Sequence, residues 1–344
     1  MNPTDPPGID TERLRRYLAA ELPGLVTGPV SARLIAGGKS NLTYRVTDGT
    51  GDWVVRRPPL GHVLATAHDM SREYRVMHGL AGTAVPVPRV RLLCHDSEII
   101  GAPFYLMDFV PGAVYRRAAD TTGVGPDRAE TMSRHLIEVL ADLHAVDPDA
   151  VGLADFGRGP GYLDRQLRRW AKQATASHNR ELPDLDALGT GLADRLPRTQ
   201  RDTIVHGDYR LDNALVDANG RIAAVLDWEM STIGDPLADL GLLRMYWDGL
   251  RDVPGGPVPD AIDPAAGFPS GDRLIEWYAA RSDLDLSGLA WYEAFGYYKL
   301  AVILEGIHYR YIHGQTVGAG FDEVGPVVPI LAAAGRRRLA ASGH

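Results

Sequence analysis

The feature that most constrains this chain is a polar run at residues 206–213 (HGDYRLDN), followed closely by residues 225–229 (VLDWE). Between the two runs, apolar stretches at 214–216 and 222–226 flank a turn sequence, DANGR, at 217–221. Such a pattern predicts a β-hairpin. A hairpin here would bring its two ends together, and with them the side chains of Asn213 and Asp227.

Three side chains in these runs suit transfer of a phosphoryl group to a hydroxyl. Asp208 and Asn213 are five positions apart, as in a loop whose carboxylate accepts a hydroxyl proton while the amide oxygen reaches a magnesium ion. Asp227 would supply the second metal ligand. A His and an Asp two positions apart would by themselves indicate only an ordinary turn, so the prediction depends on all three groups in this order.

The order HGDxxxxN, LDWE and then GDPLADL at 234–240 resembles the aminoglycoside phosphotransferase-like branch of the protein-kinase-like superfamily. The resemblance implies an α+β fold with two lobes, a small antiparallel-sheet lobe at 1–110 that binds nucleotide and a larger, mainly helical lobe at 111–344. It also implies Mg²⁺ and ATP as cofactors, with GTP possible. In the family pattern His206 has a structural role, and Asp239 is expected to order the loop backbone.

The first lobe shows strand and helix patterns in the expected order. Helical spacing after Asp10 extends to Leu22, and a second amphipathic helix is predicted at 68–82. The predicted strands, which would form one five-stranded sheet, are 30–36, 42–47, 52–57, 90–94 and 103–109.

A glycine-containing turn at 37–41 (GGKSN) is expected to cover the phosphates, because glycines allow close backbone approach and Ser40 and Asn41 can donate hydrogen bonds. An ordinary hairpin turn is the alternative. Arg56 and Glu73 occupy the positions of the kinase lysine and its helix glutamate. The alternative for that pair is an exposed strand arginine and an unrelated glutamate.

Residues 106–112 (LMDFVPG) resemble the segment between the lobes, where the backbone groups of Asp108 and Val110 would meet the adenine edge. Plain core is the alternative. In the second lobe, helices are expected at 163–176, 237–250, 273–281 and 289–311, and from 126 onward. A loop rich in proline and glycine at 253–271 is expected to be disordered or to form a lid.

Residues 165–173 (RQLRRWAKQ) resemble a helix of the kinase-like domains fused to some acyl-CoA dehydrogenases. For that subgroup a hydroxyacyl-CoA is the implied phosphate acceptor. Lys299 and Arg310 could then meet an anionic group, although surface cations on an amphipathic helix are the plainer interpretation. Arg210 and Asp212 face either the phosphates or solvent.

The composition limits the remaining possibilities. A single cysteine and the absence of a secretory signal favour a cytoplasmic location, and charged residues interrupt the long apolar stretch near 294–312, so no membrane span is expected. The net charge is −8. Residues 1–110 contain 12 Lys and Arg and 11 Asp and Glu, whereas the rest of the chain contains 24 Lys and Arg and 33 Asp and Glu. Such an acidic field argues against nucleic acid as a partner.

The expected partners are therefore a nucleotide and a small-molecule hydroxyl acceptor. Two other functions stay open. The acidic second lobe would suit a cationic acceptor such as an aminoglycoside, and the exchange of lysine for arginine at Arg56 leaves room for a nucleotide-binding protein without turnover. The sequence does not indicate an oligomeric state.

Overall fold

A computed structural model describes residues 5–35, 41–60, 69–251, 253, 262–316 and 320–341. The chain divides into two compact units, the first made of residues 1–111 with 223–229 and the second of 112–222 with 230–344. Whereas the sequence indicated a second lobe continuous from 111, residues 223–229 belong to the first unit. The Val225 N–H donates to the Pro86 carbonyl (2.8 Å), which holds this segment there. In the described ranges, no helix is both long and apolar enough to cross a membrane.

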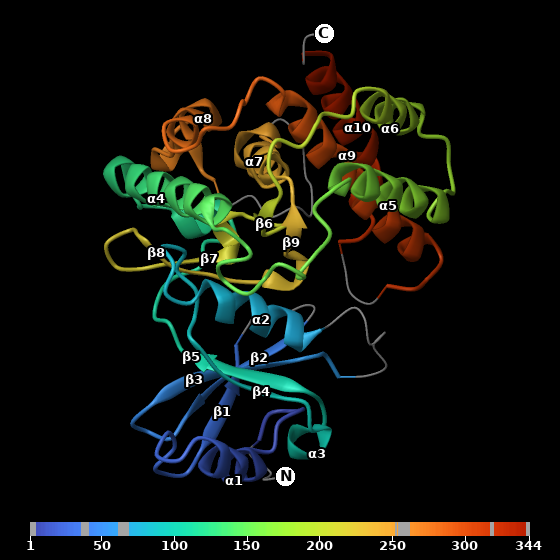
Figure 1. The fold of residues 1–344 in the computed structure, drawn as a ribbon. Helices are drawn as coiled ribbons and strands as arrows, with labels where there is room; N and C mark the ends of the chain where they lie inside the picture. Colours follow the sequence, from blue (N-terminus) through green and yellow to red (C-terminus); the bar gives the residue numbers. More distant parts are fainter. Residues whose placement is uncertain are drawn as a thin grey trace. The chain divides into compact units, whose positions relative to one another are not determined.

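The first unit contains the predicted five-stranded antiparallel sheet (Figure 1). Its strands lie in the order β1-β2-β3-β5-β4. Their bounds are β1 (Ser31–Leu34), β2 (Leu42–Thr47), β3 (Asp52–Arg57), β4 (Val90–Cys94) and β5 (Phe104–Asp108). The first three strands form a meander, and β5 pairs with β3, so that Arg56 lies opposite Tyr105.

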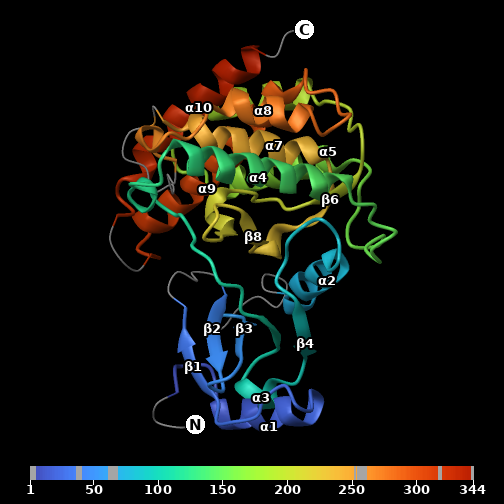
Figure 2. The same ribbon diagram turned by 90° about the vertical axis from the view of Figure 1, so that its left-hand side faces the viewer.

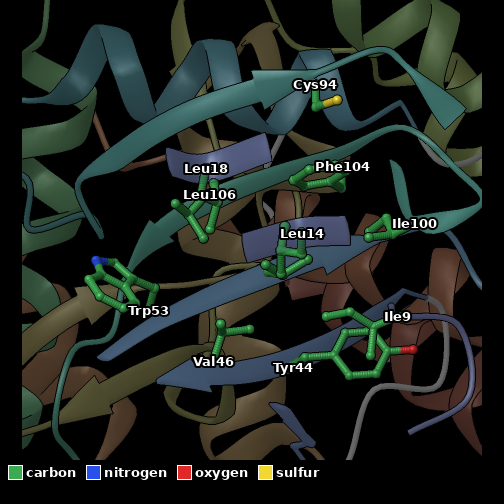
Figure 3. Packing of buried hydrophobic residues seen from close by; sticks show 11 residues of the cluster. Ile9, Leu14, Leu18, Tyr44, Val46, Trp53, Cys94, Ile100, Phe104 and Leu106 are labelled. Atoms are coloured by element: carbon green, nitrogen blue, oxygen red, sulfur yellow. The ribbon is translucent and has the colours of Figure 1, made fainter. Parts of the chain in front are cut away.

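An apolar core forms where α1 (Thr11–Glu21) packs on this sheet. The Asp10 side chain caps the helix by accepting from the Arg13 N–H (2.9 Å), and the helical spacing then buries Leu14 and Leu18. Figure 3 shows both leucines among the side chains of the strands, including Tyr44. The short helix α3 (Ser97–Ile100) lies beside α1 (Figure 2).

Helix α2 (Met70–Leu80) carries the residue that links it to the sheet. The Asp69 carboxylate caps its first turn by accepting from the N–H of Ser71 (3.0 Å). The buried residues recur at helical spacing, and Glu73 lies on this buried face with Met77. The 3.6-residue period therefore points a carboxylate into the interior of the first unit.

The second unit is mainly helical. Its α-helices are α4 (Pro126–Ala145), α5 (Tyr162–Ala176), α6 (Pro183–Asp194), α7 (Pro236–Arg244), α8 (Gly271–Ala279), α9 (Leu289–Ile312) and α10 (Val324–Ala341). Helix α9 contacts α5, α6, α7 and α10 (Figure 1). Gly241 permits the approach of α7 to α9, because a Cβ there would lie 2.5 Å from the Tyr292 Cβ.

The structure differs from the predicted helices at α7, α6 and α10. The predicted helix 237–250 ends as α-helix at Arg244 and continues as a π-helical turn, Met245–Gly249. Helices α6 and α10 were not among the helices predicted above. Gly189 weakens the pattern of α6 and Pro329 that of α10, but both helices pack on neighbours: Gly189 faces the Tyr298 ring, and α10 lies along α9.

Four short strands, β6 to β9, lie between α6 and α7 in the sequence. Strand β6 (Thr203–Val205) pairs with β9 (Thr232–Gly234) in an antiparallel register. The predicted hairpin is present as β7 (Ala214–Val216) and β8 (Ile222–Val225). Among the described residues, 3₁₀ turns lie at Ala118–Thr121, Leu211–Asn213, Trp228–Met230 and Pro264–Ala266.

Candidate active site

The loop that carries Asp208 follows β6, and its second residue is a glycine that no other residue can replace without strain. Gly207 has a φ of +82°, and a Cβ there would lie 2.7 Å from the Met230 carbonyl oxygen. Both the left-handed backbone and the close contact require the absence of a side chain. The glycine of the HGD pattern thus sets the direction in which the chain enters the loop.

Asp239 fixes the backbone of this loop, as predicted. It lies in the first turn of α7, is almost fully buried, and accepts from the N–H groups of His206 (2.6 Å) and Gly207 (2.7 Å). The Nε2 of His144 lies 3.4 Å from the same carboxylate. Burial acts to raise the pKa of Asp239, but the hydrogen bonds and the neighbouring histidines outweigh it and lower the pKa.

His206 has the structural position that the resemblance implied. Its side chain is fully buried, and its Nδ1 accepts from the Asp208 N–H (3.3 Å). Its ring packs edge-to-face on Tyr209, whose hydroxyl donates to the Leu136 carbonyl (2.7 Å). These contacts tie the loop to α4.

Asn213 holds the carboxylate of Asp208 directly. Its Nδ2 donates to the Asp208 backbone oxygen (2.8 Å) and to Oδ2 (3.1 Å). Because the NH₂ group is used in this way, the amide oxygen of Asn213 is left for another ligand. Both residues are half-buried.

Arg210 forms the other side of the Asp208 environment. Its Nε lies 3.4 Å from Asp208 Oδ1, and a terminal nitrogen lies 2.9 Å from Asp212 Oδ2. The guanidinium carbon sits 4.5 Å from the ring centroid of Tyr246, which belongs to the π-helical turn. Burial raises the pKa of Asp212, with Arg210 opposing the rise. Arg210 and Asp212 thus face each other rather than bulk solvent.

In the first unit, Arg56 and Glu73 form a buried ion pair. Arg56 Nε lies 3.0 Å from Glu73 Oε2, and the side chains are 14% and 2% exposed, so the alternative of an exposed arginine is wrong. The Tyr105 hydroxyl donates to the same carboxylate oxygen (2.9 Å). Burial raises the pKa of Glu73, and Arg56 beside it limits the rise.

Asp227 also belongs to this cluster, because a terminal nitrogen of Arg56 donates to Asp227 Oδ1 (2.6 Å). Among the described residues other than glycine, only Asp227 has a positive φ, +65°. An L-residue adopts that conformation at a cost, and such strain concentrates at functional sites. The Trp228 indole N–H donates to the Val225 carbonyl (3.0 Å) and fixes the turn that holds it.

Asn41 was predicted to donate to the phosphates, and the structure shows which protein groups its side chain contacts. Its buried amide donates to Glu73 (2.9 Å) and to Glu229 (3.3 Å), so it orients carboxylates. Ser40 and the glycines of the same turn lie outside the described residues.

Asp108 is held by the strands beside it. Its N–H donates to the Arg89 carbonyl (2.9 Å), and its carboxylate forms a two-bond ion pair with Arg91 at 2.7 and 2.8 Å. Because its N–H is used in this way, the predicted contact of Asp108 with an adenine edge would have to be made by its carbonyl. Val110 follows β5 as half-buried, non-strand backbone, and its role stays a prediction.

The second unit also contains a pocket beside Gly207. It has a volume of about 40 Å³ and is walled by residues of α5, α7 and α9 together with the loop. The lining residues used below are Tyr162, Gln166, Arg169, Trp170, Asp239 and Lys299. Lys299 was expected on the surface, yet its Nζ donates to the Gly207 carbonyl (2.8 Å) and sits 5.8 Å from the Trp170 ring centroid.

The two other cations named with this region do not line the pocket. Arg310 lies exposed in the last turn of α9. Arg165 donates to the carbonyls of Arg158 and Pro160, which anchors the segment before α5. Sequence reasoning did not identify Tyr105, Tyr246 or Glu229 as parts of the site. Of these, only Glu229 carried a signal, as the last letter of LDWE.

Comparison with known proteins agrees with this geometry. A family model described as "Phosphotransferase enzyme family" matches residues 31–277. Acyl-CoA dehydrogenase family member 10 of Mus musculus is 35% identical over 328 residues, which cover 94% of this chain and 30% of that protein. The chain thus spans about a third of the length of that relative.

Two solved structures match the fold of this chain over nearly its whole length. A candidate aminoglycoside phosphotransferase from Ralstonia eutropha is 34% identical and matches with a TM-score of 0.85, covering 97% of this chain and 99% of its own. The GDP complex of a mutant aminoglycoside 2'-phosphotransferase IIIa has 17% identity and a TM-score of 0.62, covering 97% and 100%. The predicted α+β, kinase-like fold is confirmed.

Proposed function

Because this chain belongs to the phosphotransferase enzyme family, we propose that it transfers the γ-phosphoryl group of ATP, or alternatively GTP, to a hydroxyl group of a small molecule. The observation that carries the proposal is the contact between Asn213 and Asp208 on a loop whose backbone Asp239 fixes. Phosphoryl transfer depends mainly on positioning and charge stabilisation, and this loop is positioned by buried hydrogen bonds.

Mg²⁺ would be held by the amide oxygen of Asn213 and by the carboxylate of Asp227. Both are hard oxygen donors, which Mg²⁺ prefers. The second carboxylate oxygen of Asp227 has no protein partner within the described ranges, so the residues suit the ion. When bound, the ion would offset the negative charge of the phosphates.

The remaining residues divide between nucleotide and acceptor. Arg56, oriented by Glu73, would donate to a phosphate oxygen, with Ser40 over the phosphates. The Asp108 carbonyl and the Val110 N–H would meet the adenine edge. Asp208 would accept the proton of the acceptor hydroxyl while the hydroxyl oxygen bonds to the γ-phosphorus. Arg210 and Asn213 hold the Asp208 carboxylate in place.

For the acceptor we propose a hydroxyacyl-CoA. Two observations support it, the RQxxxW pattern of α5 and the 35% identity to a protein named as an acyl-CoA dehydrogenase family member. An aminoglycoside is the alternative, suggested by the acidic balance of residues 111–344. Charges more than about 8 Å from a site are largely screened at physiological salt, so the local lining weighs more than the net charge.

Substitution of Asp208 tests the reaction. In Asp208→Asn, we expect folding and the thermal shift with MgATP to be retained while transfer to a CoA thioester or an aminoglycoside is lost. Asp227→Ala should instead remove the Mg²⁺ dependence of nucleotide binding. Products heavier by one phosphoryl group, detected by mass spectrometry, are the measurement. Full turnover in Asp208→Asn would show that Asp208 is not the base.

A further inference from the structure

The pocket beside Gly207 has a charge pattern that neither the fold nor the phosphate chemistry requires. Lys299, Arg169 and Gln166 line it and can donate hydrogen bonds, as can the Tyr162 hydroxyl and the Trp170 indole N–H. The one acidic side chain in the lining is Asp239, and both of its oxygens already accept from the loop backbone. Donors in the lining therefore outnumber the available side-chain acceptors, which are the Gln166 amide oxygen and the Tyr162 hydroxyl.

Lys299 shows this imbalance most clearly. Its ammonium group has three donors, and within the described part of the chain one is used, for the Gly207 carbonyl. Asp208 is near enough to act on its charge, but that carboxylate is held by Asn213 and Arg210. Burial lowers the pKa of Lys299, with the carboxylates of Asp208 and Asp239 opposing the shift. Lys299 is half-buried, and a partly desolvated cation with unused donors is stabilised when a ligand accepts from them.

Arg169 and Gln166, both on α5, add further hydrogen-bond donors to the lining of the pocket. Arg169 is exposed, lies 5.4 Å from the Trp170 ring centroid, and forms no ion pair with any described residue. Gln166 is one helical turn before Trp170 and likewise has no hydrogen-bond partner among the residues described. The ring of Trp170 thus lies near both Lys299 and Arg169, an arrangement that favours cations held over an aromatic face.

The size of the pocket limits what it can hold. About 40 Å³ is far below the ~300 Å³ or more of a pocket that encloses a whole drug-sized ligand. It admits the end group or a short segment of an acceptor. Because Gly207 directly precedes Asp208, that group would be only a few bonds from the hydroxyl that reacts.

We propose that Lys299, Gln166 and Arg169 form a subsite for the acyl oxygen of the acceptor, either a carboxylate or a thioester carbonyl. The three residues decide specificity by donating to this oxygen, and they disfavour an amine at the same position through like charge. The proposal rests on the proposed function, because it names the acceptor class and the residues that select it at the same site.

The test compares acceptors that differ only in this group. The panel contains a short ω-hydroxycarboxylic acid, its CoA thioester, the neutral diol and the amino alcohol of the same chain length. For each, kcat/KM is measured with MgATP in the wild-type chain and in Lys299→Met, which keeps an unbranched side chain against Trp170 but removes the charge. Lys172→Met is the matched control, since Lys172 is an exposed lysine of α5 outside the pocket lining.

We expect the ratio of kcat/KM for an acyl acceptor to that for the diol to fall about tenfold or more in Lys299→Met and to stay unchanged in Lys172→Met. A role in holding Gly207 alone would lower turnover of every acceptor and leave this ratio unchanged. The acid and the thioester arms distinguish a carboxylate from a thioester as the natural group. If neither ratio changes, or if the amino alcohol is the preferred acceptor, the proposal is wrong.

A second variant and a binding measurement keep the outcome clear. Arg169→Gln changes an exposed residue, so it should fold even if Lys299→Met does not, and the same ratio should fall. The rise in unfolding temperature caused by the acid and by the thioester is measured without nucleotide. Loss of this rise in Lys299→Met, but not in Lys172→Met, would support the subsite even if no phosphoryl transfer occurs. Absence of the rise in the wild-type chain, together with unchanged ratios in Arg169→Gln, would overturn it.

Discussion

At the scale of single residues, Arg56 shows why the type of cation matters. Kinases have a lysine at the matching position, whereas Arg56 forms an ion pair with Glu73 (Nε to Oε2, 3.0 Å) and donates from a terminal nitrogen to Asp227 (2.6 Å). A guanidinium offers these donors in a fixed plane, and a lysine offers a single point charge. The arginine therefore contacts two carboxylates through two different nitrogens that are held in one plane.

Substitution of Arg56 by lysine should separate these contacts. We expect Arg56→Lys to lower the free energy of unfolding by about 1–3 kcal/mol, because one of two partly buried carboxylates loses its partner. The Kd for MgATP should rise about tenfold, which corresponds to one lost contact. Denaturant unfolding and a calorimetric titration measure the two effects.

The matched control is Arg45→Lys. Arg45 also makes two bonds to one carboxylate, that of Asp52 at 2.9 and 2.8 Å, but this pair lies at the surface. No measurable change in stability is expected there. Equal losses in the two variants would contradict the assignment of a special role to the buried arginine.

Asp239 allows a prediction with a pH dependence. Two backbone N–H groups need its two oxygens, so Asp239→Asn leaves one of them facing an NH₂ group, and we expect a loss of about 3 kcal/mol at neutral pH. Because folding lowers the pKa of Asp239, its contribution is complete above the unfolded pKa of about 3.9 and is lost as pH falls through the folded value.

Urea unfolding between neutral pH and pH 3 therefore measures the effect. The difference between wild type and Asp239→Asn should be constant from neutral pH down to about pH 5 and then shrink on further acidification. A difference that grows as the pH falls would show that Asp239 is protonated in the folded chain.

At the scale of elements, the π-helical turn after α7 positions a side chain that a regular helix would place differently. Single π-turns inside helices are rare and often occur at functional sites. Here the turn at Met245–Gly249 sets Tyr246 under the guanidinium of Arg210, which in turn contacts Asp208. The end of a helix thereby supports the candidate base through one intermediate arginine.

Tyr246 can be tested with a pair of substitutions. Tyr246→Leu removes the aromatic face beneath Arg210, and we expect kcat to fall about three- to tenfold, the equivalent of one cation–π contact. Tyr246→Phe keeps that face and should retain kcat. Steady-state turnover of the preferred acceptor, with KM for MgATP as the reference, measures both. A loss in Tyr246→Phe as large as in Tyr246→Leu would assign the effect to the hydroxyl instead.

At the scale of the whole molecule, the first unit is not one continuous stretch of chain. The segment Ala223–Glu229 returns to it far along the sequence and contributes Asp227 and Glu229 to the cluster around Arg56. The same segment supplies the Val225 N–H that pairs with the Pro86 carbonyl. The proposed metal ligand is thus also part of the packing of this unit.

A fragment comparison tests this composition. Residues 1–111 followed by a flexible glycine-serine linker and residues 223–229 should unfold about 5 °C higher than residues 1–111 alone, the equivalent of about 1 kcal/mol for a unit of this size. A fragment with the seven residues in scrambled order is the control. Thermal circular dichroism measures all three. If the natural and scrambled segments stabilise equally, the segment does not belong to the fold of the first unit.

Local patterns in the sequence were sufficient for much of this protein. The antiparallel strands follow from apolar alternation between turn residues, α1 and α2 follow from their Asp caps and helical spacing, and the hairpin follows from its turn sequence. The spacing within HGDYRLDN predicted that Asp208 and Asn213 act together, and they are in contact. All of these depend on interactions between residues close in sequence.

Tertiary structure decided the features that join distant residues. Pairing of β3 with β5 places Tyr105 opposite Arg56, and packing of α9 against α5 and α7 makes Lys299 a pocket residue instead of a surface cation. The hydrogen bond from Asn41 to Glu73 likewise joins residues far apart in sequence. A periodic pattern shows that a face is buried, but what it is buried against depends on contacts between segments far apart in the chain, and those contacts leave no local pattern.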